Sequence, residues 1–221
     1  EACHHQIWSH ARDRGMGRRP IWQINCAPSI RFHWTGGSLV NGGRYARIGL
    51  MKPASTFKIS TLIYCFNASG EILLLQRTRP PNQGLWSPPG GKLDQETGES
   101  PHTCAARETR EELGIKAIPS DFNLKGIVSE TGHEGEHHWM MFLFEYGPRL
   151  SALPPEHPEG SFQFFPMKDV ANLNIPETDR IFIWPLVKKH KHGFFVAECD
   201  CHEDGTFAWR ELESFDCQQI S

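Results

Sequence analysis

Short apolar runs bounded by turn residues occur through most of this chain after residue 56. They are rich in β-branched and aromatic residues, as is typical of β-strands, and they lie at 58–66, 71–77, 115–118, 123–129, 139–146, 161–166, 194–198 and 206–212. Asn67, Ala68, Ser69 and Gly70 form a turn signal between the first two runs. We therefore expect 58–66 and 71–77 to pair as a hairpin.

Two segments have helical patterns. Ser100 is a preferred N-cap, Pro101 suits the first helical position, and Gly114 suits the left-handed C-cap, so the sequence predicts a helix over 101–113. A second helix is expected to begin at Pro176 and to bend at Pro185. Its apolar residues are Ile181, Trp184, Leu186 and Val187. Strands combined with two helices favour a layered α/β fold.

The first helix carries an acidic edge. At about 100° per residue, Glu108, Glu111 and Glu112 fall within an arc of roughly 100°. Carboxylates this close repel one another on an isolated helix, whereas Mg²⁺ binds such oxygens together with substrate phosphates. The acids therefore suggest a metal site facing phosphate. The alternative is a solvated glutamate-rich helix surface, which is common.

The surrounding residues favour the metal site. Three parts of this region together closely resemble the signature of the Nudix hydrolases. They are Gly90-Gly91-Lys92, Glu99 and Arg107-Glu108-x-x-Glu111-Glu112-x-Gly114. The loop between Gly91 and Glu99 has seven intervening residues where that signature has five, and Thr109 fills a position that is usually apolar. The resemblance implies an α/β/α sandwich with a mixed central sheet and Mg²⁺-dependent hydrolysis of a nucleoside diphosphate-linked substrate, with Mn²⁺ as another possible ion.

The resemblance also assigns roles to residues. Metal ligands would be the Gly91 carbonyl, the three helix glutamates and a further loop acid, Glu159, whose alternative is a solvent-facing loop residue. Arg107 would orient a neighbouring acid, Glu108 or Glu112 would act as general base, and Glu99 would hold the loop. Gly90 and Gly114 would be structural. Arg77 and Arg79, which follow the run at 71–77, are candidate phosphate contacts, although surface charge is the alternative role.

A second resemblance concerns the substrate. Residues 175–195 are similar to the C-terminal helix and strand of the oxidised-purine nucleoside triphosphatases, the MutT-like enzymes that hydrolyse 8-oxo-dGTP and sanitise the nucleotide pool. Their acidic pair that reads the base edge is matched most nearly by Glu177 and Asp179, while Ile175 stands where they have tryptophan. The alternatives are a Nudix enzyme that cleaves ADP-ribose, dinucleoside polyphosphate or CTP, and a non-catalytic nucleotide-binding regulator.

Composition and charge limit the classes of partner that we expect for this protein. With 221 residues, 38% of them hydrophobic and a net charge of −3, the chain has room for one domain and an appendage and has no general basic field for polymeric nucleic acid. No apolar run is long enough for a membrane span and no secretory signal opens the chain, so we expect a cytoplasmic protein. The pattern indicates no particular oligomeric state.

The cysteines are seven in number and irregularly spaced, which favours reduced thiols over a disulfide framework. Cys199-x-Cys201-His202 could be a fragment of a metal site, but its spacing differs from that of the usual zinc motifs. We interpret the two alternating cysteines as packing residues of a strand.

The segment before residue 53 differs from the rest, because its residues show neither a helical nor a strand period. We predict that residues 1–52 are an N-terminal extension and that 53–216 form the Nudix domain. One hypothesis is that translation naturally starts at Met51. The other is a genuine but poorly ordered extension, and N-terminal mass analysis of protein made from the native gene would distinguish the two.

Overall fold

The computed structural model describes residues 57–80, 82–133 and 137–216. The predicted N-terminal extension at residues 1–52 lies outside the described residues and stays a prediction. Among the described residues, no helix is long and apolar enough to cross a membrane.

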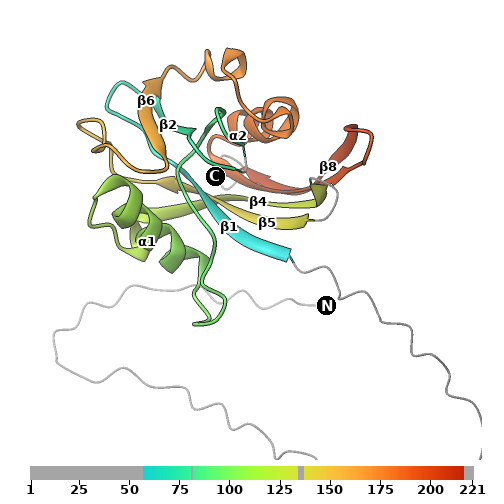
Figure 1. Ribbon diagram of the computed structural model, residues 1–221, viewed down its shortest axis with the longest axis horizontal. Helices are drawn as coiled ribbons and strands as arrows, with labels where there is room; N and C mark the ends of the chain where they lie inside the picture. Colours follow the sequence, from blue (N-terminus) through green and yellow to red (C-terminus); the bar gives the residue numbers. More distant parts are fainter. Residues whose placement is uncertain (1–56, 81, 134–136, 217–221) are drawn as a thin grey trace, which may run out of the picture. The chain divides into compact units, whose positions relative to one another are not determined.

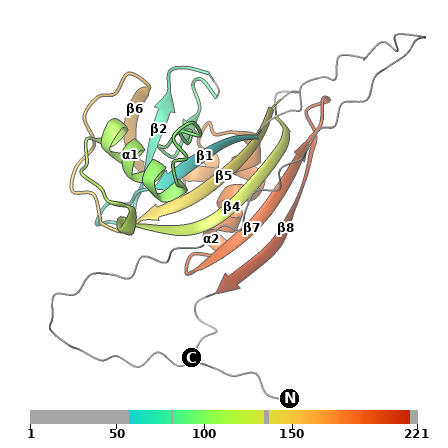
Figure 2. The ribbon, with the colours of Figure 1, turned by 90° about the horizontal axis from the view of Figure 1, so that it is seen from below.

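A mixed five-stranded sheet forms the centre of the fold (Figure 1). Its spatial order is β1 (Phe57–Tyr64), β5 (His137–Tyr146), β4 (Phe122–His133), β7 (Gly193–Cys201) and β8 (Phe207–Asp216). β1 runs parallel to β5 and β4 runs parallel to β7, while the other two pairs are antiparallel. Figure 2 shows the long strands β5, β4, β7 and β8 side by side as a curved sheet.

A smaller antiparallel sheet has the order β3 (Trp86–Ser87), β2 (Ile72–Arg77) and β6 (Gly160–Phe165). β2 is buried throughout its apolar part, with side chains that alternate between two hydrophobic cores. Burial on both sides explains why β2 consists of consecutive apolar residues.

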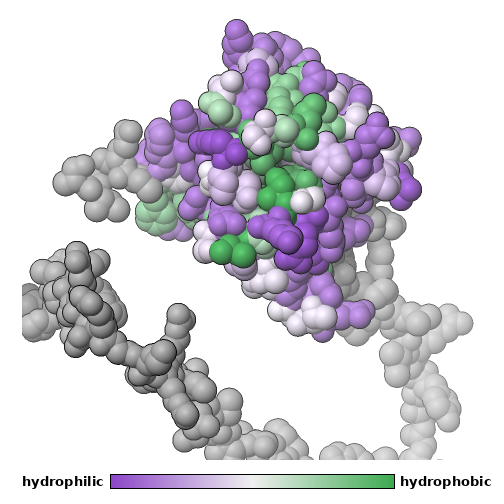
Figure 3. Space-filling model, turned by 90° about the vertical axis from the view of Figure 1, so that its left-hand side faces the viewer, coloured by the Kyte–Doolittle hydropathy of each residue, from purple (hydrophilic) through white to green (hydrophobic). Residues whose placement is uncertain are grey.

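Figure 3 views the molecule from the left-hand side of Figure 1, and hydrophilic residues cover most of that face around a strip of apolar ones.

The two cores lie on opposite faces of the large sheet. One contains Ala105 and Leu113 of helix α1 (Pro101–Leu113), and the other contains Trp184 and Leu186 of helix α2 (Trp184–Lys189). Short 3₁₀ turns span Pro119–Asp121 and Val170–Asn172. Because helices cover both faces of a mixed sheet, the predicted α/β/α sandwich is confirmed (Figure 1).

Both ends of α1 are as predicted. The Ser100 hydroxyl oxygen accepts the backbone N–H of Thr103 at 3.2 Å, and Gly114 ends the helix with φ of 70°. The second helix contains a π-helical turn that the sequence did not predict, η3 (Asp179–Ile183), directly before α2. The N–H of Trp184 donates to the carbonyl of Asp179, one residue beyond the α-helical partner, and Pro185 follows directly. The π turn thus ends two residues before Pro185, where the sequence predicts a bend.

Two strand predictions are wrong. β1 and β2 meet only at the turn, where the N–H of Leu73 donates to the carbonyl of Cys65 at 2.8 Å, and they then enter different sheets. β1 instead pairs with β5 along its whole length. Residues 115–118 form no strand; they lead into the 3₁₀ turn at Pro119, and Ile118 is exposed.

Candidate active site

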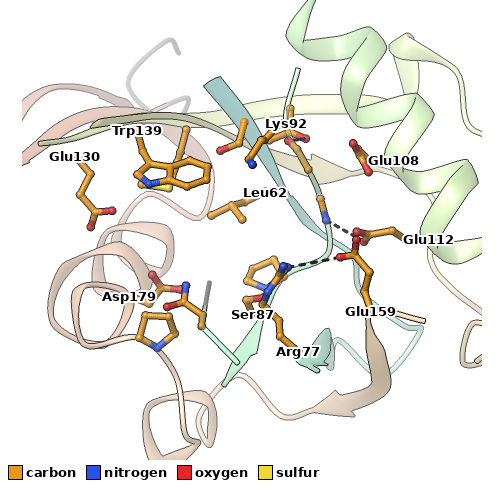
Figure 4. Close-up of a pocket in the computed structure, with 18 of the residues that line it drawn as sticks. Leu62, Arg77, Ser87, Lys92, Glu108, Glu112, Glu130, Trp139, Glu159 and Asp179 are labelled. Carbon is orange, nitrogen blue, oxygen red and sulfur yellow. Dashed lines mark hydrogen bonds and ion pairs between the residues drawn. The ribbon is translucent and has the colours of Figure 1, made fainter. Parts of the chain in front are cut away.

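A cavity of about 470 Å³ opens beside the carboxyl-terminal half of α1 and reaches across to η3 (Figure 4). One end is lined by charged and glycine residues: Arg77, Gly90, Gly91, Lys92, Glu108, Glu112 and Glu159. The other end combines apolar walls with two acids, namely Leu62, Glu130, Trp139, Met141, Pro176 and Asp179. The volume suits a small molecule, and the lining suits one with a charged part and a flat apolar part.

The charged end is built by packing the glycine loop onto α1. The N–H of Gly90 donates to Glu112 Oε2 at 3.0 Å, and a Cβ at Gly91 would lie 2.3 Å from Glu108 Oε1. Only glycine at residue 91 allows the loop to pass this close to that carboxylate. The Gly91 carbonyl accepts the backbone N–H of Thr61 at 2.8 Å, so a metal would have to use its second lone pair.

Both helix acids in the cavity are buried, with Glu108 9% and Glu112 4% exposed. Burial raises the pKa of Glu112 to about 8; the N–H of Gly90 opposes this shift, and the charge of Glu108 adds to it. Burial likewise raises the pKa of Glu108, against the lowering effect of Arg107. Two desolvated carboxylates beside one cavity are unfavourable alone, and a divalent cation would relieve their repulsion. The donor set therefore fits Mg²⁺.

Arg107 organises the acids around it. Its Nε and Nη2 donate to the two carboxylate oxygens of Glu99, both at 2.9 Å, and its Nη1 donates to Glu108 at 2.7 Å and Glu111 at 3.0 Å. Glu99 also accepts the N–H of Asp94 at 2.9 Å, and its pKa is lowered chiefly by the hydrogen bond from Arg107. This network ties the signature loop to the helix and fixes the Glu108 carboxylate, the geometry expected of the predicted orienting role.

Some predicted residues lie outside the cavity. Glu111 has 56% of its side chain exposed and contacts Arg107, and Arg79 is exposed. Glu177 is also largely exposed, and it pairs with Arg180 at 3.3 Å. Of the predicted acidic pair at the second helix, only Asp179 lines the cavity.

The remaining predicted residues face the cavity from two neighbouring strands. Arg77 lies at the end of β2, and Glu159 directly precedes β6. Their side chains form an ion pair at 3.8 Å (Figure 4). The antiparallel pairing of Arg77 with Gly160 brings these residues, which are distant in sequence, to the charged end of the cavity.

Sequence reasoning missed Glu130, Trp139 and Lys92. Trp139 and Met141 alternate along β5 and so present side chains to the same cavity. The Nζ of Lys92 lies 5.8 Å from the centre of the Trp139 ring. Glu130 is 4% exposed in β4. Burial raises the pKa of Asp179 to about 7, and the charge of Glu130 adds to this shift. The run at 139–144 is apolar without interruption, so its pattern could not show which side chains face the cavity.

A layered α/β/α fold with buried carboxylates at one end of a mixed polar and apolar cavity defines a class of small-molecule enzyme site. Residues 56–185 match the NUDIX domain family. The chain is 37% identical over 131 residues to the uncharacterised Nudix hydrolase YvcI of Bacillus subtilis (strain 168), covering 57% of this chain and 78% of that protein. The chain belongs to the Nudix family.

Solved structures agree with this assignment. The mutator MutT protein from Bacillus halodurans matches with a TM-score of 0.57 and 25% identity, covering 70% of this chain and 97% of that one. The MutT protein from Methanosarcina mazei Go1 matches with a TM-score of 0.53 and 25% identity, covering 62% and 98%. The chain is thus a Nudix hydrolase, in a family that acts on pyrophosphate bonds of nucleotide substrates and generally requires a divalent metal ion.

Proposed function

We propose that this protein hydrolyses an oxidised purine nucleoside triphosphate, such as 8-oxo-dGTP, to the monophosphate and pyrophosphate with Mg²⁺. The observation that carries the hydrolytic part is the pair of buried carboxylates, Glu108 and Glu112, at one end of the cavity. Similarity to the two MutT structures supports the choice of substrate branch.

At the charged end, the carboxylates of Glu108, Glu112 and Glu159 would hold the metal. Mg²⁺, when bound, supplies Lewis-acid stabilisation of the charge that develops on the phosphate oxygens. Glu108 or Glu112 takes the proton of the attacking water, and Arg107 keeps the Glu108 carboxylate in position through the 2.7 Å hydrogen bond. Arg77 lines the same end, where its positive charge favours the polyphosphate, whereas the Lys92 Nζ lies 5.8 Å from the centre of the Trp139 ring.

At the other end, a purine would lie against Trp139 and Met141 with its edge toward Asp179 and Glu130. A carboxyl whose pKa is near 7 can donate a hydrogen bond when protonated and accept one when ionised. Such a carboxyl suits a base edge that presents both N–H donors and a carbonyl, as guanine and its oxidised form both do.

A substrate panel tests the proposed activity. The purified chain with Mg²⁺ would be given 8-oxo-dGTP, dGTP, ADP-ribose, a dinucleoside polyphosphate and CTP, and products would be separated by chromatography. We expect the highest kcat/KM for 8-oxo-dGTP, with pyrophosphate as co-product. Preferred cleavage of ADP-ribose, the dinucleoside or CTP would replace the substrate assignment, and binding without turnover across the panel would favour a regulator.

The base-recognition role is tested by replacing Asp179 with asparagine. We expect KM for 8-oxo-dGTP to rise by about 10- to 100-fold with a smaller change in kcat, because a hydrogen bond to a charged group contributes about 1.5–3 kcal/mol. The matched control is Glu177→Gln, since Glu177 belongs to the same helix region but pairs with Arg180 outside the cavity. Steady-state kinetics with equal KM values for both variants would contradict the role.

A further inference from the structure

A second cluster of metal-ligating side chains borders the base end of the cavity. Glu130 on β4 is paired with Cys199 on the adjacent parallel strand β7, and Cys201 follows two residues later on the same face of β7. One ligand atom from each residue lies within 4.8 Å of the other two. The cluster uses none of the helix glutamates of the Nudix signature.

We propose that Glu130, Cys199 and Cys201 bind a thiophilic divalent cation such as Zn²⁺. Zinc–sulfur bonds of about 2.3 Å in a tetrahedral site place two sulfurs about 3.8 Å apart. The Sγ atoms of Cys199 and Cys201 are 3.9 Å apart, so little movement is needed to reach that geometry. Glu130 supplies the third donor and also lines the cavity, which gives the ion and a coordinating water a route from solvent.

A disulfide fits the same two cysteines less well. Residues two apart on an extended strand have Cα atoms about 6.6 Å apart, near the upper end of the disulfide range of about 4.4–6.8 Å. The sulfurs would also have to approach from 3.9 Å to about 2.0 Å while both residues remain in the β7 ladder. Metal binding keeps the strand as it is, whereas a disulfide would distort it.

The two metal sites would select different ions. Mg²⁺ prefers oxygen ligands, which Glu108 and Glu112 provide, while thiolate sulfur selects softer ions such as Zn²⁺. Each cysteine must lose its proton when the metal binds. Zinc binding is therefore expected to release protons and to strengthen as pH rises.

The functional consequence rests on the proposed function. A Glu130 carboxylate that held zinc would have fewer lone pairs for a substrate base. Zn²⁺ at this cluster would therefore raise KM for 8-oxo-dGTP while leaving the signature acids in place. Zinc binding to Glu130, Cys199 and Cys201 does not depend on this effect on the substrate.

Cobalt titration tests the site in the 221-residue chain under reducing conditions. Co²⁺ bound to thiolates gives sulfur-to-metal charge-transfer absorption in the near ultraviolet. Added Zn²⁺ should displace the Co²⁺ and abolish this absorption. We expect this band in the wild-type protein and at least a tenfold weaker affinity in Cys201→Ser and in Glu130→Gln, because even outer ligands contribute about 10- to 100-fold. Circular dichroism would verify that these variants fold.

Two further variants make the test specific. Cys65→Ala removes a buried thiol from the core on the opposite face of the sheet, so it should retain the cobalt band. Glu112→Gln should also retain it, which separates this site from the signature site and from hydrolysis. A missing band, or one that is equally strong in Cys201→Ser, would overturn the proposal and leave the two cysteines as packing residues.

Discussion

Replacing Glu112 with glutamine is expected to lower kcat by at least about a hundredfold while the protein stays folded. Glutamine keeps the size of the side chain and can still accept the N–H of Gly90, which bonds Glu112 at 3.0 Å. It removes the negative charge that a divalent cation and a water proton both require. Turnover with saturating Mg²⁺, measured by pyrophosphate release, checks this prediction.

The matched control is Glu96→Gln, which removes an exposed acid from the same signature loop and should leave kcat nearly unchanged. Glu111→Gln is expected to have a smaller effect than Glu112→Gln, since Glu111 is exposed and lies outside the cavity lining. Near-normal turnover of Glu112→Gln would contradict the assignment of this carboxylate to the site.

Without divalent metal, the protein is expected to lose stability as pH rises from about 4.5 to about 8. The pKa of Glu112 is raised from 4.5 in an unfolded chain to about 8 in the folded protein, so within this window the folded state binds more protons. Stability from this group is fully present below pH 4.5 and is lost as pH approaches 8. Added Mg²⁺ should reverse the loss, because the cation replaces the proton.

Thermal unfolding in a chelator and in Mg²⁺, followed by circular dichroism across this pH range, measures the effect. In the chelator near pH 8, Glu112→Gln should have a higher Tm than wild type, by about 2–4 °C for each kcal/mol gained. It should also lose most of the added stability that Mg²⁺ gives the wild-type protein. If the Mg²⁺-dependent rise in Tm were the same in both proteins, Glu112 would not be a metal ligand.

The signature helix could be predicted from sequence because its determinants are local. The Ser100 cap, Pro101 and Gly114 define α1 within a single segment, and the spacing of Glu108 and Glu112 places them on one edge. The helical period alone could not show which of the three glutamates, Glu108, Glu111 or Glu112, faces the cavity. Packing of the Gly90-Gly91 loop decided that, by covering Glu108 and Glu112 and leaving Glu111 exposed.

The sequence by itself determined the family, the signature helix and most of the strands, because caps, short-range periods and a fixed motif act between near neighbours along the chain. Only the tertiary structure decided that β1 pairs with β5, and that Glu130, Trp139 and Asp179 meet at one cavity. Those arrangements arise because the β-strands must bury side chains on both faces of the sheet. The partners that satisfy this requirement are far apart in sequence, where no local pattern specifies them.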